Sequence, residues 1–113
     1  MGLYCFKIQY TPEAIATIVK TSSNREEAAK KAVESVGGKL HGFYGIFGDP
    51  EGFHVMLIAE TPSNAEYLAT VVSSVLGGAV ANVRTNVLYS AADMVKATEI
   101  INNSGVDYAP PGS

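Results

Sequence analysis

Alternating and periodic apolar positions along the chain predict four strands joined by helices. Period-two alternation marks four apolar-rich runs, at residues 4–10, 39–47, 53–60 and 79–88. Apolar residues at helical spacing occupy the stretches 12–36 and 62–76. The order strand, helix, strand therefore occurs twice. With right-handed crossovers, this βαββαβ order predicts an α+β, ferredoxin-like fold: a four-stranded antiparallel sheet in the order 4-1-3-2, with its helices on one face.

The helical stretches contain apolar stripes that should face the sheet. A polar break at residues 21–24 divides the first stretch into two helices, approximately Pro12–Lys20 and Asn24–Val36. A further, C-terminal helix is expected after Ser90, with Asp93 as its capping partner. The stripes predicted to pack inward are Ala29, Ala32, Val33 and Val36 in the first stretch, and Ala65, Leu68, Ala69, Val72 and Leu76 in the second.

Length and composition fit a single domain. The chain has 113 residues, of which 47% are hydrophobic and 17% charged, and this composition excludes a disordered chain. We assign residues 1–101 to one ferredoxin-like domain and residues 102–113 to a C-terminal tail containing Gly and Pro. No apolar run approaches the roughly 18 residues of a membrane span, so no membrane association is expected.

The net charge and the cysteine content indicate which partners and which cellular compartment to expect. Lys and Arg number 8 against 11 Asp and Glu, and the net charge of −3 disfavours a nucleic-acid binder. The aromatic run His41–Phe47 is similar to the signature of RNA-recognition modules, but it lies on the second strand instead of the third. The single cysteine, Cys5, cannot build a disulfide framework, and this favours a cytoplasmic protein.

Strand alternation predicts a polar, net-positive surface on the face of the sheet that no helix covers. On each strand the more apolar set of alternate residues should face the helices, and the other set should face away. The residues expected on this helix-free face are Cys5, Lys7 and Gln9 from the first strand, His54, Met56 and Ile58 from the third, and Asn82, Arg84 and Asn86 from the fourth. The second strand leaves two alternatives open for its core side: Leu40, Tyr44 and Ile46, or His41, Phe43 and Phe47.

Three interpretations of the helix-free face stay open. In the first, it packs against a second sheet in a homodimer. In the second, it encloses a pocket in which Lys7 and Arg84 hold a small anionic or enolic ligand. In the third, it faces solvent, as one side of an antiparallel sheet can do without further purpose.

The sequence predicts no metal site and no cofactor. Metal sites need three or four convergent ligands, and no spacing brings His41 and His54 together with suitable carboxylates. His54 is a chemically reasonable general base, although a half-buried sheet histidine is the simpler interpretation. Cys5 is better explained as a small buried residue than as a nucleophile. The chain also lacks Gly-x-Gly-x-x-Gly, Walker-type and Gly-x-Ser-x-Gly motifs.

A series of short motifs resembles one protein family. They are Ser23–Ala29, Val36–Leu40, Phe43–Tyr44, Phe47–Gly48, Glu60–Pro62 and Asn82–Thr85. Their order and spacing over residues 3–97 resemble the GYD-domain family, named for a Gly-Tyr-Asp signature. Where the family has Gly-Tyr-Asp entering the third strand, this chain has Gly52-Phe53-His54. The resemblance therefore supports no role that needs an acid at this position.

The resemblance implies a fold akin to the dimeric α+β barrels, in which two sheets pack face to face. It implies no settled activity. Relatives at the level of the fold include cofactor-independent monooxygenases, muconolactone-isomerase-like enzymes and haem-binding proteins, but a shared fold does not fix a function.

The leading hypothesis is a cytoplasmic homodimer or higher homo-oligomer, formed through the sheet face, that binds a small anionic or enolic ligand without a cofactor. One alternative is a cofactor-independent oxygenase or isomerase, with His54 as base and Arg84 stabilising an enolate. The other is a non-catalytic interaction or structural subunit. The predicted ligand contacts are Lys7, Arg84 and His54, with Gln9, Tyr44, Asn82 and Asn86 as secondary polar contacts.

Overall fold

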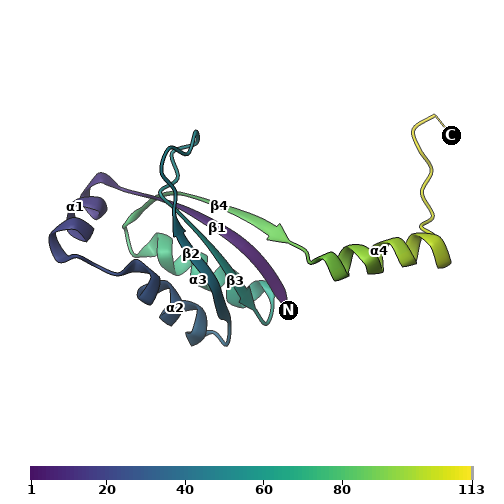
Figure 1. Ribbon diagram of the computed structural model, residues 1–113, viewed down its shortest axis with the longest axis horizontal. Helices are drawn as coiled ribbons and strands as arrows, with labels where there is room; N and C mark the ends of the chain where they lie inside the picture. The colour runs from purple at the N-terminus through teal and green to yellow at the C-terminus, as the bar shows by residue number, and fades with distance from the viewer. Residues whose placement is uncertain (113) are drawn as a thin grey trace.

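The computed structural model describes residues 1–112 and contains the predicted sheet (Figure 1). Its elements are β1 (Gly2–Tyr10), α1 (Pro12–Thr21), α2 (Arg25–Ser35), β2 (Lys39–Gly45), β3 (Val55–Thr61), α3 (Asn64–Leu76), β4 (Val80–Leu88) and α4 (Ala91–Asn103). The strands pair antiparallel in the order β2-β3-β1-β4, which is the predicted order read from the other edge. The chain therefore has an α+β, ferredoxin-like arrangement, as the repeated strand-helix-strand pattern predicts.

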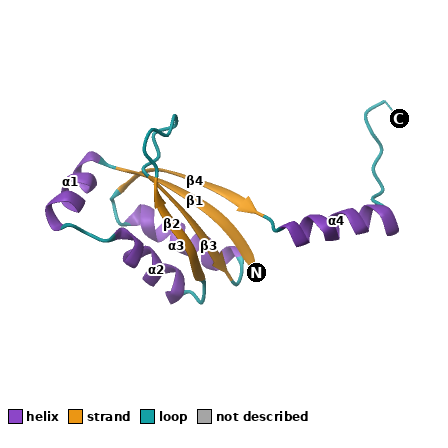
Figure 2. Ribbon diagram, in the orientation of Figure 1, coloured by secondary structure: helices purple, strands orange, loops and turns teal. Residues whose placement is uncertain are grey.

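The core lies between one face of the sheet and the helices α2 and α3 (Figure 2). Strand alternation predicted its sheet side correctly, because the residues expected to face the helices, Tyr4, Phe6, Ile8, Val55, Leu57 and Ala59, all belong to the buried core. Val33 of α2 and Tyr67 of α3 close this core from the helix side. No helix among residues 1–112 covers the opposite face of the sheet, which is called the helix-free face in the following sections.

A bulge on β2 explains why alternation left that strand ambiguous. The register with β3 slips between Leu40 and Gly42, so Leu40 and Phe43 both pack on the core although an odd number of positions separates them. Tyr44, opposite Met56 of β3, then faces the helix-free side. Leu40 of the first alternative and Phe43 of the second are therefore both core residues. A bulge inserts one residue into the strand, so the residues before and after it no longer follow the same alternation.

Helix α3 buries a different side from the one its apolar spacing predicted. Leu68 and Leu76 of the predicted stripe are 59% and 80% exposed, whereas Tyr67 is buried. The Tyr67 ring stacks on Tyr4 with centroids 3.9 Å apart, and its hydroxyl hydrogen-bonds the Thr85 hydroxyl at 2.8 Å. The predicted stripe is wrong because apolar residues surround most of this helix, and aromatic stacking selects the side that faces the sheet.

The hydrogen bond of Tyr67 gives a first prediction. Burial raises the pKa of Tyr67, so its hydroxyl stays protonated and bound to Thr85. Tyr67→Phe should lower the free energy of unfolding by about 0.5–1.5 kcal/mol in urea titrations, because the variant lacks the hydrogen bond between the buried Tyr67 and Thr85. Tyr89→Phe is the matched control, since Tyr89 is 70% exposed, and it should change nothing. Equal effects of the two variants would contradict the assigned bond.

The first crossover consists of two helices, as the polar break predicted. Thr11 caps α1 by accepting a hydrogen bond from the Ala14 backbone, and Asn24 caps α2. Between them, Ser22 adopts a left-handed conformation with φ of 50°. This turn redirects the chain, so that only α2 runs across the sheet beside α3 (Figure 1).

The C-terminal helix α4 projects away from the rest of the molecule (Figure 1). It begins with the predicted capping box, in which Ser90 and Asp93 each accept a hydrogen bond from the other's backbone. Every residue of α4 is exposed. Within residues 1–112, no helix has both the length and the apolar composition needed to cross a membrane.

Candidate functional site

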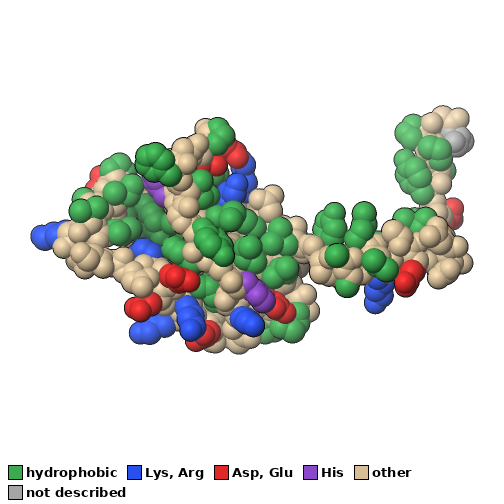
Figure 3. Space-filling view, in the orientation of Figure 1, with side chains coloured by type: hydrophobic (Ala, Val, Ile, Leu, Met, Phe, Trp, Pro, Cys, Tyr) green, Lys and Arg blue, Asp and Glu red, His purple; other side chains and the backbone are tan. Residues whose placement is uncertain are grey.

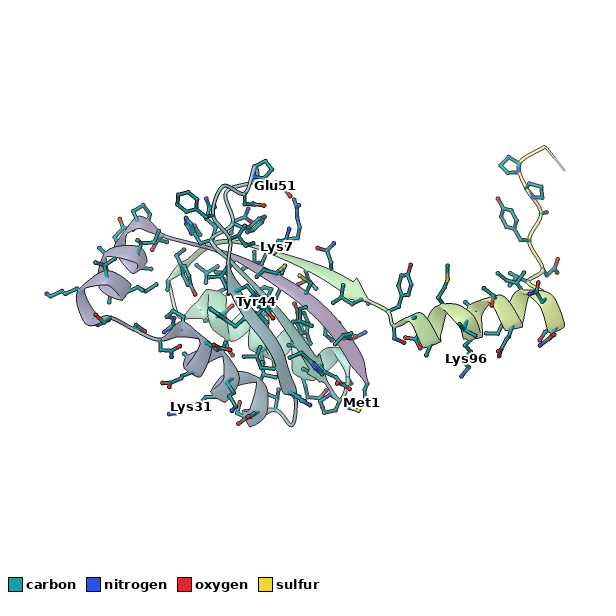
Figure 4. All side chains as sticks on the ribbon, in the orientation of Figure 1. Met1, Lys7, Lys31, Tyr44, Glu51 and Lys96 are labelled. Carbon is teal, nitrogen blue, oxygen red and sulfur yellow. The ribbon has the colours of Figure 1, made fainter. Side chains whose placement is uncertain are left out.

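Cross-strand pairing brings the predicted ligand contacts together on the helix-free face. One row crosses all four strands, from Tyr44 through Met56 and Lys7 to Arg84. The neighbouring row on one side contains Cys5 and Asn86, and the row on the other side contains Gln9 and Asn82. Figure 4 shows Lys7 and Tyr44 over the sheet, with Glu51 in the loop beyond them.

The loop between β2 and β3 lies over this face and reaches across it. It starts and ends on the β2–β3 side of the sheet, yet Glu51 forms an ion pair with Arg84 on the far strand β4. Phe53 is only 3% exposed, and the Arg84 guanidinium lies 5.5 Å from its ring centroid. A ligand that binds Arg84 therefore has to share this cation with Glu51 or displace it.

The loop is held in this conformation by its own side chains. The Asp49 carboxylate accepts hydrogen bonds from the backbone of Glu51 at 3.2 Å and of Phe53 at 3.0 Å. Gly52 has φ of +84°, a conformation that favours glycine. This sharp turn directs the Phe53 side chain into the molecule.

His54 is committed to the backbone of β1. Its Nδ1 accepts a hydrogen bond from the Tyr10 backbone at 3.0 Å, and its ring lies parallel to that of Tyr10 at 6.2 Å. The bond forms where the register between β1 and β4 shifts, between Gln9 and Tyr10. Because Nδ1 accepts this hydrogen bond, it carries no hydrogen. The neutral His54 ring therefore carries its one ring N–H on Nε2. Neither nitrogen is then free to remove a proton, and the general-base hypothesis gains no support from this geometry.

Lys7 differs from Arg84 in lacking a carboxylate partner. It lies half-buried on the central strand β1. The ion pairs among residues 1–112 involve Lys30, His41 and Arg84, and none involves Lys7. Lys7 is therefore the cation of this face that is available to an anion. Within the same residues, no group of three His, Cys, Asp or Glu side chains is arranged to hold a metal ion.

A second candidate site, which the sequence did not indicate, is a cavity of about 350 Å³ between α2, α3 and the sheet. Phe6, Ile8 and Leu57 of the sheet line it together with Phe43, Val33 and Tyr67. Its polar lining residues include Arg25, Thr70, Ser73 and Ser74. Close-packed interiors leave few such voids. The signal available in the sequence is a set of small residues on α2, namely Ala28, Ala29 and Ala32, facing large aromatic residues.

Comparison with known proteins places the chain in a family. The model of the GYD domain matches residues 4–98, which include α1 to α3 and the whole sheet except the first two residues of β1. The chain belongs to the GYD-domain family. No curated protein matches it.

The segment compared above with the Gly-Tyr-Asp signature, Gly52-Phe53-His54, lies in the connection between β2 and β3. Here Gly52 makes the turn, Phe53 is buried, and His54 accepts the Tyr10 hydrogen bond. In this GYD-domain protein the segment therefore fixes the loop to the sheet. Sequence reasoning proposed His54 as a ligand contact and missed this anchoring role, because the contacts join segments far apart in the chain.

Proposed function

We propose that this protein binds a small, largely apolar ligand with an acidic or enolic group in the cavity between α2 and α3. The observation that carries the proposal is the cavity itself, whose volume of about 350 Å³ falls within the range of ligand sites. Its aromatic and aliphatic walls favour an apolar ligand, since burying apolar surface is the main source of affinity. The few polar groups of the lining supply orientation.

Arg25 supplies the charge that favours an acidic ligand. It is the first residue of α2 and lines the cavity, and it takes part in none of the ion pairs among residues 1–112. A guanidinium forms paired hydrogen bonds with a carboxylate or an enolate oxygen. The ligand's acidic end would bind Arg25 while its apolar part occupies the space against Phe6 and Leu57.

A titration with 8-anilinonaphthalene-1-sulfonate, an apolar anion, tests this proposal. Ala29→Phe introduces a ring into the cavity lining and should weaken the binding of this probe at least tenfold. Ala16→Phe is the matched control on the exposed surface of α1, outside the cavity, and should leave the affinity unchanged. Circular dichroism checks that both variants fold. Unchanged affinity in a folded Ala29→Phe variant would rule out the cavity as the site.

The helix-free face is a second candidate site, and the unpaired Lys7 is the observation that favours it. If this face is the site, two copies of the chain pack with their helix-free faces together. Lys7 then pairs with an anionic ligand or with a carboxylate of the second copy. Gln9, Asn82 and Asn86 provide amide groups near this cation. The same titration separates the two sites, because Lys7→Met should weaken binding here and leave binding in the cavity unchanged.

A further inference from the structure

Helix α4 has an apolar face that no other residue within 1–112 covers. Met94, Ala97 and Ile101 recur at helical spacing, and Met94 and Ile101 are 53% and 60% exposed. Figure 3 shows hydrophobic side chains gathered along one side of this helix, and Figure 4 shows Lys96 on the other side. An isolated helix shorter than about 12–15 residues is marginal in water, and α4 has 13. Its amphipathic pattern therefore requires a partner surface.

The same chain carries a helix with an apolar face of matching length. Helix α3 also has 13 residues, and its inner side packs on the core through Tyr67 and Val71. On its outer side, Leu68, Val72 and Leu76 are 59%, 46% and 80% exposed. A helix that is apolar on both sides is normally buried on both sides. The outer face of α3, defined by these three residues, is thus an uncovered apolar surface of the same length as α4.

We propose that α4 of one chain packs on the outer face of α3 in a second copy, so that two copies exchange their C-terminal helices. Only Tyr89 and Ser90 join β4 to α4, and the helix projects away from its own α3 (Figure 1). A two-fold axis makes both contacts at once, because each copy has one donor helix and one acceptor face.

The charges of α4 favour a protein partner over a membrane. Its charged residues are Asp93, Lys96 and Glu99, so the helix has a net negative charge. Helices that bind anionic lipid surfaces carry Lys and Arg on their polar face instead. The proposal does not depend on either ligand site, since it concerns other surfaces of the molecule.

Cross-linking of the full chain tests the exchange. In a Cys5→Ser background, one protein carries Ala69→Cys, beside the outer face of α3, and the other carries Thr98→Cys, beside the apolar face of α4. Both positions are exposed, so these variants should fold normally. After the two proteins are mixed, a short bis-maleimide should join α3 of one chain to α4 of the other. Glu99→Cys, on the polar side of α4, is the control and should give several-fold less product.

Two other outcomes would overturn the proposal. A chain carrying both Ala69→Cys and Thr98→Cys that cross-links only within itself would show that α4 folds back onto its own α3. A mixture that gives no product between α3 and α4 would show that α4 binds elsewhere. Light scattering gives the independent readout: the native chain should be a dimer, and Met94→Glu with Ile101→Glu should weaken the dimer at least tenfold, whereas Lys96→Glu should not.

Discussion

Phe53→Ala should lower the free energy of unfolding by about 3–5 kcal/mol, the usual cost of truncating a buried phenylalanine. Phe53 belongs to a loop, where large losses are uncommon, yet it is only 3% exposed. Its ring lies beneath the Arg84 guanidinium, and its backbone is bound by Asp49. Removing the ring should therefore release the loop from the helix-free face. Urea unfolding measures the loss of stability.

Phe47→Ala is the matched control for this prediction, because both phenylalanines flank the same turn. Phe47 is fully exposed, and its truncation should change the stability by no more than about 0.5 kcal/mol. Proteolysis gives a second readout, since a released loop becomes accessible to a protease. If Phe53→Ala were as mild as Phe47→Ala, the loop would not be anchored through this ring.

The central strands show how far the sequence determines this fold. On β1 and β3, strict alternation of apolar residues predicted which residues pack against the helices, and no irregularity disturbs the pairing of the two strands. On β2, the bulge after Leu40 interrupts the alternation, so alternation could not predict which residues face the core. On α3, periodicity could not choose between two apolar sides, and the stacking of Tyr67 on Tyr4 made the choice. Such long-range contacts are absent from local patterns.

The candidate sites were predicted to different degrees. Alternation brought Lys7 and Arg84 together correctly, because their strands pair directly. It could not show that Glu51 reaches Arg84, since a loop's path depends on contacts made after the sheet has formed. The cavity was not predictable either. An empty volume is a property of packing in three dimensions, and a pattern of apolar residues indicates a core whether or not that core is filled.

His54→Leu should lower the free energy of unfolding by about 1–3 kcal/mol, because it leaves a buried backbone donor without an acceptor. The donor is Tyr10, which is 8% exposed and gives its hydrogen bond to His54 Nδ1. Leucine keeps a comparable volume and removes only the acceptor. Hydrogen exchange of the Tyr10 amide should accelerate in this variant, which identifies the site of the loss directly.

His54→Asp should recover most of this stability, and the comparison bears on the family signature. A carboxylate accepts backbone hydrogen bonds as an unprotonated imidazole nitrogen does, so the aspartate of Gly-Tyr-Asp and the histidine here can satisfy the same donor. The control is His41→Leu, which removes an exposed pair with Glu60 and should cost no more than about 1 kcal/mol. If His54→Asp destabilised the protein as much as His54→Leu, an aspartate at this position would not accept the Tyr10 hydrogen bond in place of the histidine.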